Sequence, residues 1–167
     1  MQKIISSITL LLILLVSANG TTNHQRKAGL VYYIMKNVEW PSDKPVNSDY
    51  IITVIGSAEM KAELERVTAD KKIANKPIKV VRASKAEDVQ NSHIVYLTDD
   101  YSNQFLKARF IANSFGALLF TESEGFAARG SSINLVTDQG RIAFEINNKS
   151  ISAVNVKLSS RIKEMAY

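Results

Sequence analysis

The most informative residues of this 167-residue chain are 124–147, with the sequence EGFAARGSSINLVTDQGRIAFEIN. Gly125 and Gly130 bound a loop, and two runs of strand-forming residues follow it at 132–137 and 141–146. Between the two runs lies Asp138-Gln139-Gly140, and a glycine suits the positive φ that short hairpin loops demand. The stretch therefore predicts a glycine-bounded loop followed directly by a β-hairpin.

Helix and strand patterns alternate upstream of this stretch, and helical patterns also follow it. We expect helices at 24–38, 58–69, 100–113 and from residue 157, with short helical segments at 86–90 and 148–153. We expect the remaining strands at 50–55, 78–82, 94–97 and 117–121, and a basic loop around Asn75-Lys76-Pro77. In the helix at 100–113 the residues expected to face inward are Phe105, Leu106, Phe110 and Ile111. Such alternation predicts an α/β fold, a three-layer α/β/α sandwich with a mixed, mostly parallel sheet and a C-terminal β-hairpin.

The first twenty residues have the layout of a secretory signal peptide. Lys3 gives a positive start, residues 4–16 are largely apolar, and Ser17-Ala18-Asn19-Gly20 supplies small residues for a peptidase. Cleavage after Ala18 and cleavage after Gly20 fit equally well, and an uncleaved N-terminal anchor is the alternative. We therefore expect residues 1–20 to be a signal peptide and 21–167 to form a single domain outside the cytoplasm.

Composition narrows the classes of function. The chain carries 21 basic and 16 acidic residues, a formal charge of +5, and no cysteine. Thiol catalysis and thiolate metal sites are thereby excluded. The densest basic stretch, 71–85, indicates a solvated lysine-rich face, an anionic membrane surface or an acidic partner. Nucleic acid is not an expected partner of an exported protein.

Few residues could carry catalysis. The two histidines, His24 and His93, are far apart and make a poor zinc site, so we expect no metal and no cofactor. Glu122 and Glu124 flank the glycine-bounded loop and form a candidate acid/base pair for a hydrolase. No nucleophile or histidine lies near them in sequence, so the main expectation is that the protein is not an enzyme.

Two further hypotheses concern binding. Trp40, the only tryptophan, ends the first predicted helix and could line a small-molecule cleft with Tyr32 or Tyr33, although packing over the helix end is the alternative. Glu145 is a carboxylate within a strand. It is expected either to pair with Arg129 or Arg141 or to face a partner.

The chain resembles the YfiR-like family, named for a periplasmic repressor of a membrane-bound diguanylate cyclase. The resemblance covers essentially the whole mature chain, although family members often carry a cysteine where this chain has Ser92. It rests on the order and spacing of Lys27-Ala28-Gly29-Leu30-Val31-Tyr32-Tyr33, Val38-Glu39-Trp40-Pro41, Val54-Ile55-Gly56, Lys76-Pro77-Ile78, Ser92-His93-Ile94-Val95-Tyr96-Leu97, Gly125-Phe126-Ala127, Gly130, Ile133-Asn134, Phe144-Glu145-Ile146-Asn147 and Leu158-Ser159-Ser160.

The resemblance implies a non-enzymatic periplasmic regulator. It implies an inner-membrane sensor protein, of the diguanylate cyclase or kinase type, as the partner that is repressed, with lower cyclic di-GMP and less biofilm as the result. An outer-membrane-associated sequestering protein and a second copy of the chain are further implied partners. On this reading the partner surface lies on the loop and hairpin, and the candidate residues are Phe126, Arg129, Ile133, Glu145, Asn147 and Ile151.

Overall fold

The computed structural model describes residues 22–41 and 49–167. The predicted signal peptide, residues 1–20, lies outside the described residues, and its cleavage stays a prediction. Within the described ranges, no helix is both long enough and apolar enough to cross a bilayer.

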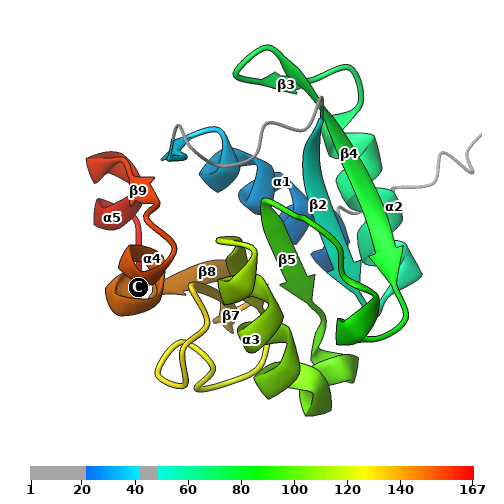
Figure 1. Ribbon diagram of the computed structural model, residues 1–167. Helices are drawn as coiled ribbons and strands as arrows, with labels where there is room; N and C mark the ends of the chain where they lie inside the picture. Colours follow the sequence, from blue (N-terminus) through cyan, green and yellow to red (C-terminus); the bar gives the residue numbers. More distant parts are fainter. Residues whose placement is uncertain (1–21, 42–48) are drawn as a thin grey trace, which may run out of the picture.

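Seven strands of the described chain form one curled sheet in the order β3-β4-β2-β5-β6-β7-β8 (Figure 1). The strands β4, β2, β5, β6 and β7 run parallel, and the sheet ends in an antiparallel strand on each side, β3 and β8. Their bounds are Tyr50–Ile55 (β2), Lys72–Ile73 (β3), Lys76–Ala83 (β4), Ile94–Leu97 (β5), Leu118–Thr121 (β6), Ile133–Asp138 (β7) and Arg141–Ile146 (β8). The predicted mixed, mostly parallel sheet is confirmed.

Helices cover both faces of this sheet, as the three-layer prediction requires (Figure 1). One face carries α1 (Asn23–Met35), α2 (Ala58–Thr68), α4 (Asn148–Ala153) and α5 (Ser160–Glu164). The other face carries α3 (Phe105–Ser114) and the 3-10 helices η1 (Ala86–Asp88) and η2 (Asp99–Gln104). The helices α1, α2, α4 and α5 each begin at a polar N-cap whose side chain accepts a backbone N–H. These N-caps are Thr22, Ser57, Asn147 and Ser159.

The core has two parts because the central strands are buried on both faces. Every residue of β5 and β6 is buried, as the continuous apolar runs of a parallel sheet require. Tyr96 and Phe120 turn toward the side of α1 and α2, whereas Val95 and Leu119 turn toward α3. The alternation of side chains along a strand thus separates the two clusters.

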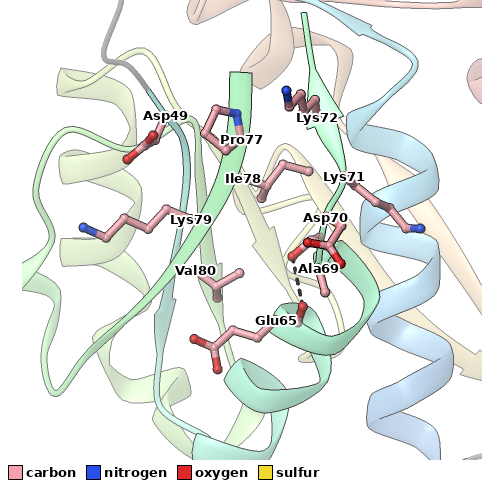
Figure 2. Close-up of a pocket in the computed structure, with 11 residues that line it drawn as sticks. Asp49, Glu65, Ala69, Asp70, Lys71, Lys72, Pro77, Ile78, Lys79 and Val80 are labelled. Atoms are coloured by element: carbon pink, nitrogen blue, oxygen red, sulfur yellow. Dashed lines mark hydrogen bonds between the residues drawn. The ribbon is translucent and has the colours of Figure 1, made fainter. Parts of the chain in front are cut away.

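The basic segment at 71–77 is not the loop that we expected. Lys72 and Ile73 form β3, which pairs with Pro77 and Lys76 at the start of β4. The turn between them uses Ala74 and Asn75, both with positive φ (49° and 65°). Two residues per strand are too short to give a periodic pattern, so sequence reasoning missed the hairpin. It borders the hollow drawn in Figure 2.

Helix α3 buries a different face from the one that we expected. Phe105 is buried together with Ala108 and Ala112, but Leu106 is 63% exposed and Phe110 is 74% exposed. The spacing of the buried residues, i, i+3 and i+7, is as helical as the one we chose. Small alanines at the contact let α3 lie close to the sheet, which the rule of burying the largest residues overlooked.

This exposure has a testable consequence for stability. We expect Phe110→Ser to change the free energy of unfolding by no more than about 0.5 kcal/mol, because the ring already contacts water. Urea denaturation of the variant beside the parent protein measures the difference. A loss above about 2 kcal/mol would show that the ring is covered in solution.

The C-terminal segment also starts differently. We expected the last helix to begin near Lys157, but Lys157 and Leu158 form β9, which pairs with Val38 and Glu39 of β1 (Val38–Glu39). Ser159 then caps α5, which begins at Ser160. The predicted hairpin is present as β7 and β8, and α4, β9 and α5 follow it.

Candidate partner-binding surface

Residues 123–130, named here the glycine loop, connect β6 to β7 beside the start of α4. Gly125 and Gly130 both have positive φ, 73° and 108°. At Gly130 an added Cβ would lie 3.0 Å from the Arg109 side chain, so the chain approaches α3 closely at this point. The two glycines therefore fix the path of the loop, as the sequence predicted.

An aromatic and cationic contact holds the glycine loop on α3. The ring of Phe126 is 5% exposed and lies 4.2 Å from the ring of Phe105. The guanidinium of Arg129 lies 4.9 Å from the Phe105 ring centre and 4.7 Å from the Phe126 ring centre. Such cation–π contacts at exposed sites are worth about 0.5–1 kcal/mol each. They present Arg129 at the surface in a defined position.

Three hydrogen bonds complete the support of the loop carbonyls. Arg109 Nη1 donates to the Arg129 carbonyl at 2.5 Å, and Asn147 Nδ2 donates to the Ala127 carbonyl at 2.7 Å. The Ser150 hydroxyl donates to the Gly130 carbonyl at 3.0 Å. Asn147 also caps α4 by accepting the Ser150 N–H. The loop, α3 and α4 are therefore one preorganised unit.

The six residues predicted for the partner surface fall into two groups. Arg129 is exposed, and Glu145 and Asn147 are half-buried. The three apolar residues are buried: Phe126, Ile133 and Ile151. Phe126 belongs to the core cluster on the α3 face, whereas Ile133 and Ile151 belong to the cluster on the α1 face. Buried side chains have almost no area to offer a partner, so the polar three are the ones a partner can reach in this conformation.

Glu145 is held by an amide, not by an arginine. Asn134 Nδ2 donates to Glu145 Oε2 at 2.9 Å, and Asn134 Oδ1 accepts from the Thr121 hydroxyl at 2.7 Å. The expected partners are engaged elsewhere or apart: Arg129 lies on the two phenylalanine rings, and Arg141 is exposed and makes no ion pair with a described residue. The carboxylate is therefore fixed in place without having its charge neutralised.

Sequence reasoning missed the buried polar residues beneath this surface. Thr121 and Asn134 are fully buried, and so is Ser131, whose hydroxyl lies 2.8 Å from that of Thr121. Asn134 interrupts the apolar run Ile133-Asn134-Leu135-Val136, and a buried amide must find hydrogen-bond partners. That interruption was the signal that could have pointed to the network.

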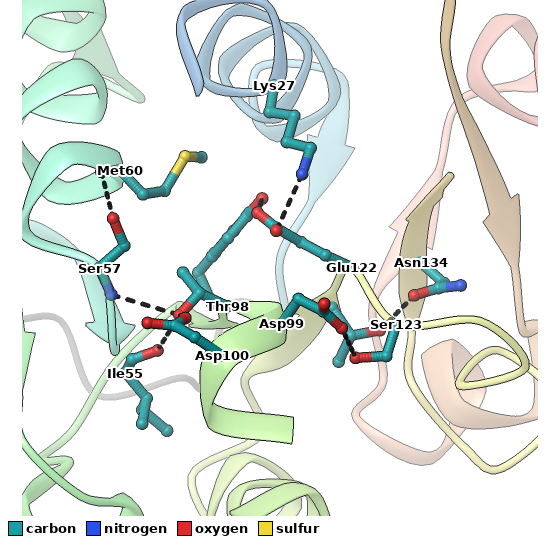
Figure 3. A network of polar contacts seen from close by, with 12 residues as sticks. Lys27, Ile55, Ser57, Met60, Thr98, Asp99, Asp100, Glu122, Ser123 and Asn134 are labelled. Atoms are coloured by element: carbon teal, nitrogen blue, oxygen red, sulfur yellow. Dashed lines mark hydrogen bonds and ion pairs between the residues drawn. The ribbon is translucent and has the colours of Figure 1, made fainter. Parts of the chain in front are cut away.

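Glu122 joins α1 to the sheet (Figure 3). Its Oε2 lies 2.8 Å from Lys27 Nζ, with the two side chains only 6% and 15% exposed, and its Oε1 accepts from the Tyr96 hydroxyl. Burial, followed by the charge of Glu122 and this hydrogen bond, raises the pKa of the Tyr96 phenol well above its usual value. Ion pairing and hydrogen bonding account for Glu122 without an acid/base role.

Glu124 and Glu122 do lie together, as the hydrolase hypothesis required. They line a hollow of about 310 Å³ with Asp138, Glu145 and Tyr167. Neither histidine belongs to its lining. No group of side chains within the described ranges has the makeup of a metal site.

Trp40, Tyr32 and Tyr33, which the small-molecule hypothesis placed in one cleft, contact different residues of the protein. Trp40 is half-buried and packs edge-on against Tyr50 and His93, with ring centres 5.7 and 5.5 Å away. Tyr32 and Tyr33 lie on α1 beneath lysine ammonium groups. The hollows of about 680, 470, 410 and 310 Å³ are lined by other residues. The ligand hypothesis therefore gains no support from their placement.

The fold is that of an α/β protein, and a family model shows to which family the chain belongs. Residues 24–167 match the model of the YfiR/HmsC-like family, so the chain belongs to that family. The family consists of periplasmic, non-catalytic regulators of inner-membrane diguanylate cyclases. No curated protein sequence matches the chain.

Solved structures share the fold at low sequence identity. A conserved domain protein from Vibrio cholerae O1 biovar El Tor superimposes with a TM-score of 0.60 at 16% identity, over 87% of this chain and 59% of that one. An ABC domain in complex with L-Trp from Streptococcus pneumonia gives a TM-score of 0.56 at 11% identity, over 86% and 59%. This chain therefore spans 59% of the length of each, and the likeness concerns the fold alone.

Proposed function

We propose that this protein is an exported repressor that binds the periplasmic sensor domain of an inner-membrane diguanylate cyclase and holds the enzyme inactive. Residues 1–20 serve as its signal peptide. Repression lowers cyclic di-GMP and with it biofilm formation. The observation that carries the proposal is the family match over residues 24–167.

The proposed contact surface consists of Arg129, Glu145 and Asn147, together with the exposed backbone of the glycine loop. Each of these side chains is positioned by contacts within the protein before any partner arrives. Preorganisation reduces the entropy that binding must overcome. Glu145 adds a negative charge without an ion-pair partner among the described residues, which suits a basic group on the sensor domain.

The mechanism is a linkage between binding and conformation. The sensor domain exchanges between inactive and active states, and a repressor shifts this equilibrium only through its difference in affinity for the two. Driving a population from 1:99 to 99:1 needs a preference of about 10⁴-fold. A rigid surface suits this task because it does not adapt to the active state.

We expect Glu145→Lys to weaken binding of the sensor domain by more than about tenfold, because it reverses the charge at the contact. Glu145→Gln keeps an oxygen that can accept the Asn134 amide hydrogen, so it is expected to weaken binding less and to leave the fold intact. Isothermal titration calorimetry with the purified sensor domain measures both variants. Glu59→Lys, an exposed glutamate on α2, is the matched control and should bind normally.

Normal binding by Glu145→Lys would refute the surface assignment. If circular dichroism shows that Glu145→Lys is unfolded, the surface assignment is tested by the binding of Glu145→Gln alone.

An outer-membrane-associated protein that sequesters the repressor would compete with the sensor domain for the same surface.

A further inference from the structure

Among the residues that the structure describes, strand β4 has no neighbouring strand on its outer side along most of its length. On its inner side it pairs with β2 from Ile78 to Ala83. On its outer side β3 pairs only with Lys76 and Pro77, and no strand of the described chain continues this pairing along residues 78–83. In a parallel strand about half of the residues direct both N–H and C=O to each side. These groups of β4 are therefore available to an added strand.

Exposed cations surround this edge. Lys79 and Arg82 lie on β4, and Lys71 and Lys72 lie at β3. None of the four makes an ion pair with a described residue, although Arg82 Nε donates to the Gly56 carbonyl at 2.6 Å and Lys71 lies over the Tyr32 ring. The edge is thus basic, and its charges are not neutralised in this part of the chain.

A hollow of about 680 Å³ lies beside the edge, between β4 and the end of α2 (Figure 2). Ile78 and Val80 point to the α2 side of the strand, whereas Lys79 points to the opposite side. Val80 is buried, so the exposed apolar surface comes from the half-buried Ile78. The carboxylates that also line it are Asp49, Asp70 and Glu65, and Glu65 is already paired with Lys61. Lys71, Lys72 and Lys79 also belong to the lining, so with Glu65 paired to Lys61 three ammonium groups stand against the two carboxylates of Asp49 and Asp70.

We propose that the outer edge of β4 docks an extended acidic segment of a partner protein as an additional strand. Main-chain hydrogen bonds to residues 78–83 give the contact its affinity, and alternate side chains give it specificity. Side chains on the α2 side of the added strand contact Ile78. Carboxylates on the other side face Lys79. The segment that fits therefore alternates acidic and apolar residues.

Lysine on an edge strand also discourages strand pairing between copies of a protein. That effect would leave the edge unoccupied, whereas the apolar surface of Ile78 beside it and the surplus of positive charge favour an acidic strand. This edge lies at the opposite end of the sheet from the β7–β8 hairpin, with β2, β5 and β6 between them. The inference is therefore independent of the partner surface proposed above.

The test uses the mature protein and fluorescein-labelled peptides of about ten residues, the length of a long strand. One peptide alternates glutamate with valine and threonine, a second has lysine in place of glutamate, and a third is the acidic peptide with two prolines. Fluorescence anisotropy measures binding at low and at physiological ionic strength. Hydrogen exchange followed by mass spectrometry reports protection of residues 78–83.

We expect the acidic peptide to bind and to protect residues 78–83, the lysine peptide not to bind, and the proline peptide to bind at least about tenfold more weakly. Lys79→Glu should weaken the acidic peptide by about tenfold, whereas Lys163→Glu, an exposed lysine on α5, should not.

Three results would overturn the proposal. The first is that the proline peptide binds as tightly as the acidic peptide, which would show that charge alone is recognised. The second is the absence of peptide binding or of protection at residues 78–83. The third is binding to phosphatidylglycerol vesicles with no binding to the acidic peptide, which would assign the basic edge to a membrane surface.

Discussion

Replacing Glu122 with glutamine is expected to lower the free energy of unfolding by about 3 kcal/mol, because it leaves a largely buried ammonium without its counter-charge. Lys27 Nζ lies 2.8 Å from Glu122, and the two side chains are 15% and 6% exposed. Lys27 keeps some contact with water, which places the loss at the lower end of the range for broken buried pairs. Urea denaturation at neutral pH gives the value.

The double variant Lys27→Met with Glu122→Gln supplies the control. Removing both charges takes away the unpaired ammonium together with its partner, so we expect it to recover most of the stability lost by Glu122→Gln. Tyr96 can still donate to the glutamine oxygen in this variant. If Glu122→Gln is as stable as the parent protein, the ion pair does not join α1 to the sheet in solution.

Replacing Gly56 with alanine is expected to cost about 3 kcal/mol or more, since both the backbone and the space around it exclude a side chain. Gly56 has a φ of 117°, and an added Cβ would lie 1.9 Å from Thr98 Oγ1. That hydroxyl cannot easily move, because it accepts the Ser57 N–H and donates to the Asp100 carboxylate, with the Ile55 carbonyl 3.2 Å away (Figure 3). Thermal and urea unfolding measure the cost.

Gly140→Ala is the matched control for this prediction. Gly140 also has a positive φ, 77°, but no atom lies within 4 Å of the added Cβ. Only the backbone strain remains, and we expect a loss of about 1 kcal/mol. Equal losses at the two positions would show that the close approach of Thr98 to the turn contributes nothing.

Much of the fold could be predicted from the sequence because the central strands have strong local patterns. The apolar runs at 50–55 and 94–97 are continuous because parallel strands are buried on both faces. The elements that were missed lie where the local pattern is weak. β3 and β9 have two residues each, and their pairing depends on contacts with β4 and β1 that no local pattern records.

The candidate surface could be predicted less completely. The glycine loop was recognisable from Gly125 and Gly130, since their positive φ values are a local property. The choice of Phe126, Ile133 and Ile151 as contact residues did not consider burial, which depends on how α3 and α4 pack against the loop. Likewise, the link from Thr121 through Asn134 to Glu145 joins three strands and has no signature in one segment.

Affinity capture tests the repressor account most directly. The tagged, exported protein is isolated from its own cells after mild cross-linking, and the captured proteins are identified by mass spectrometry for the parent protein and for Glu145→Lys. We predict that the parent protein captures an inner-membrane protein with a diguanylate cyclase domain and that Glu145→Lys captures much less of it. Capture without any such membrane protein would contradict the account and favour a periplasmic small-molecule binding protein instead.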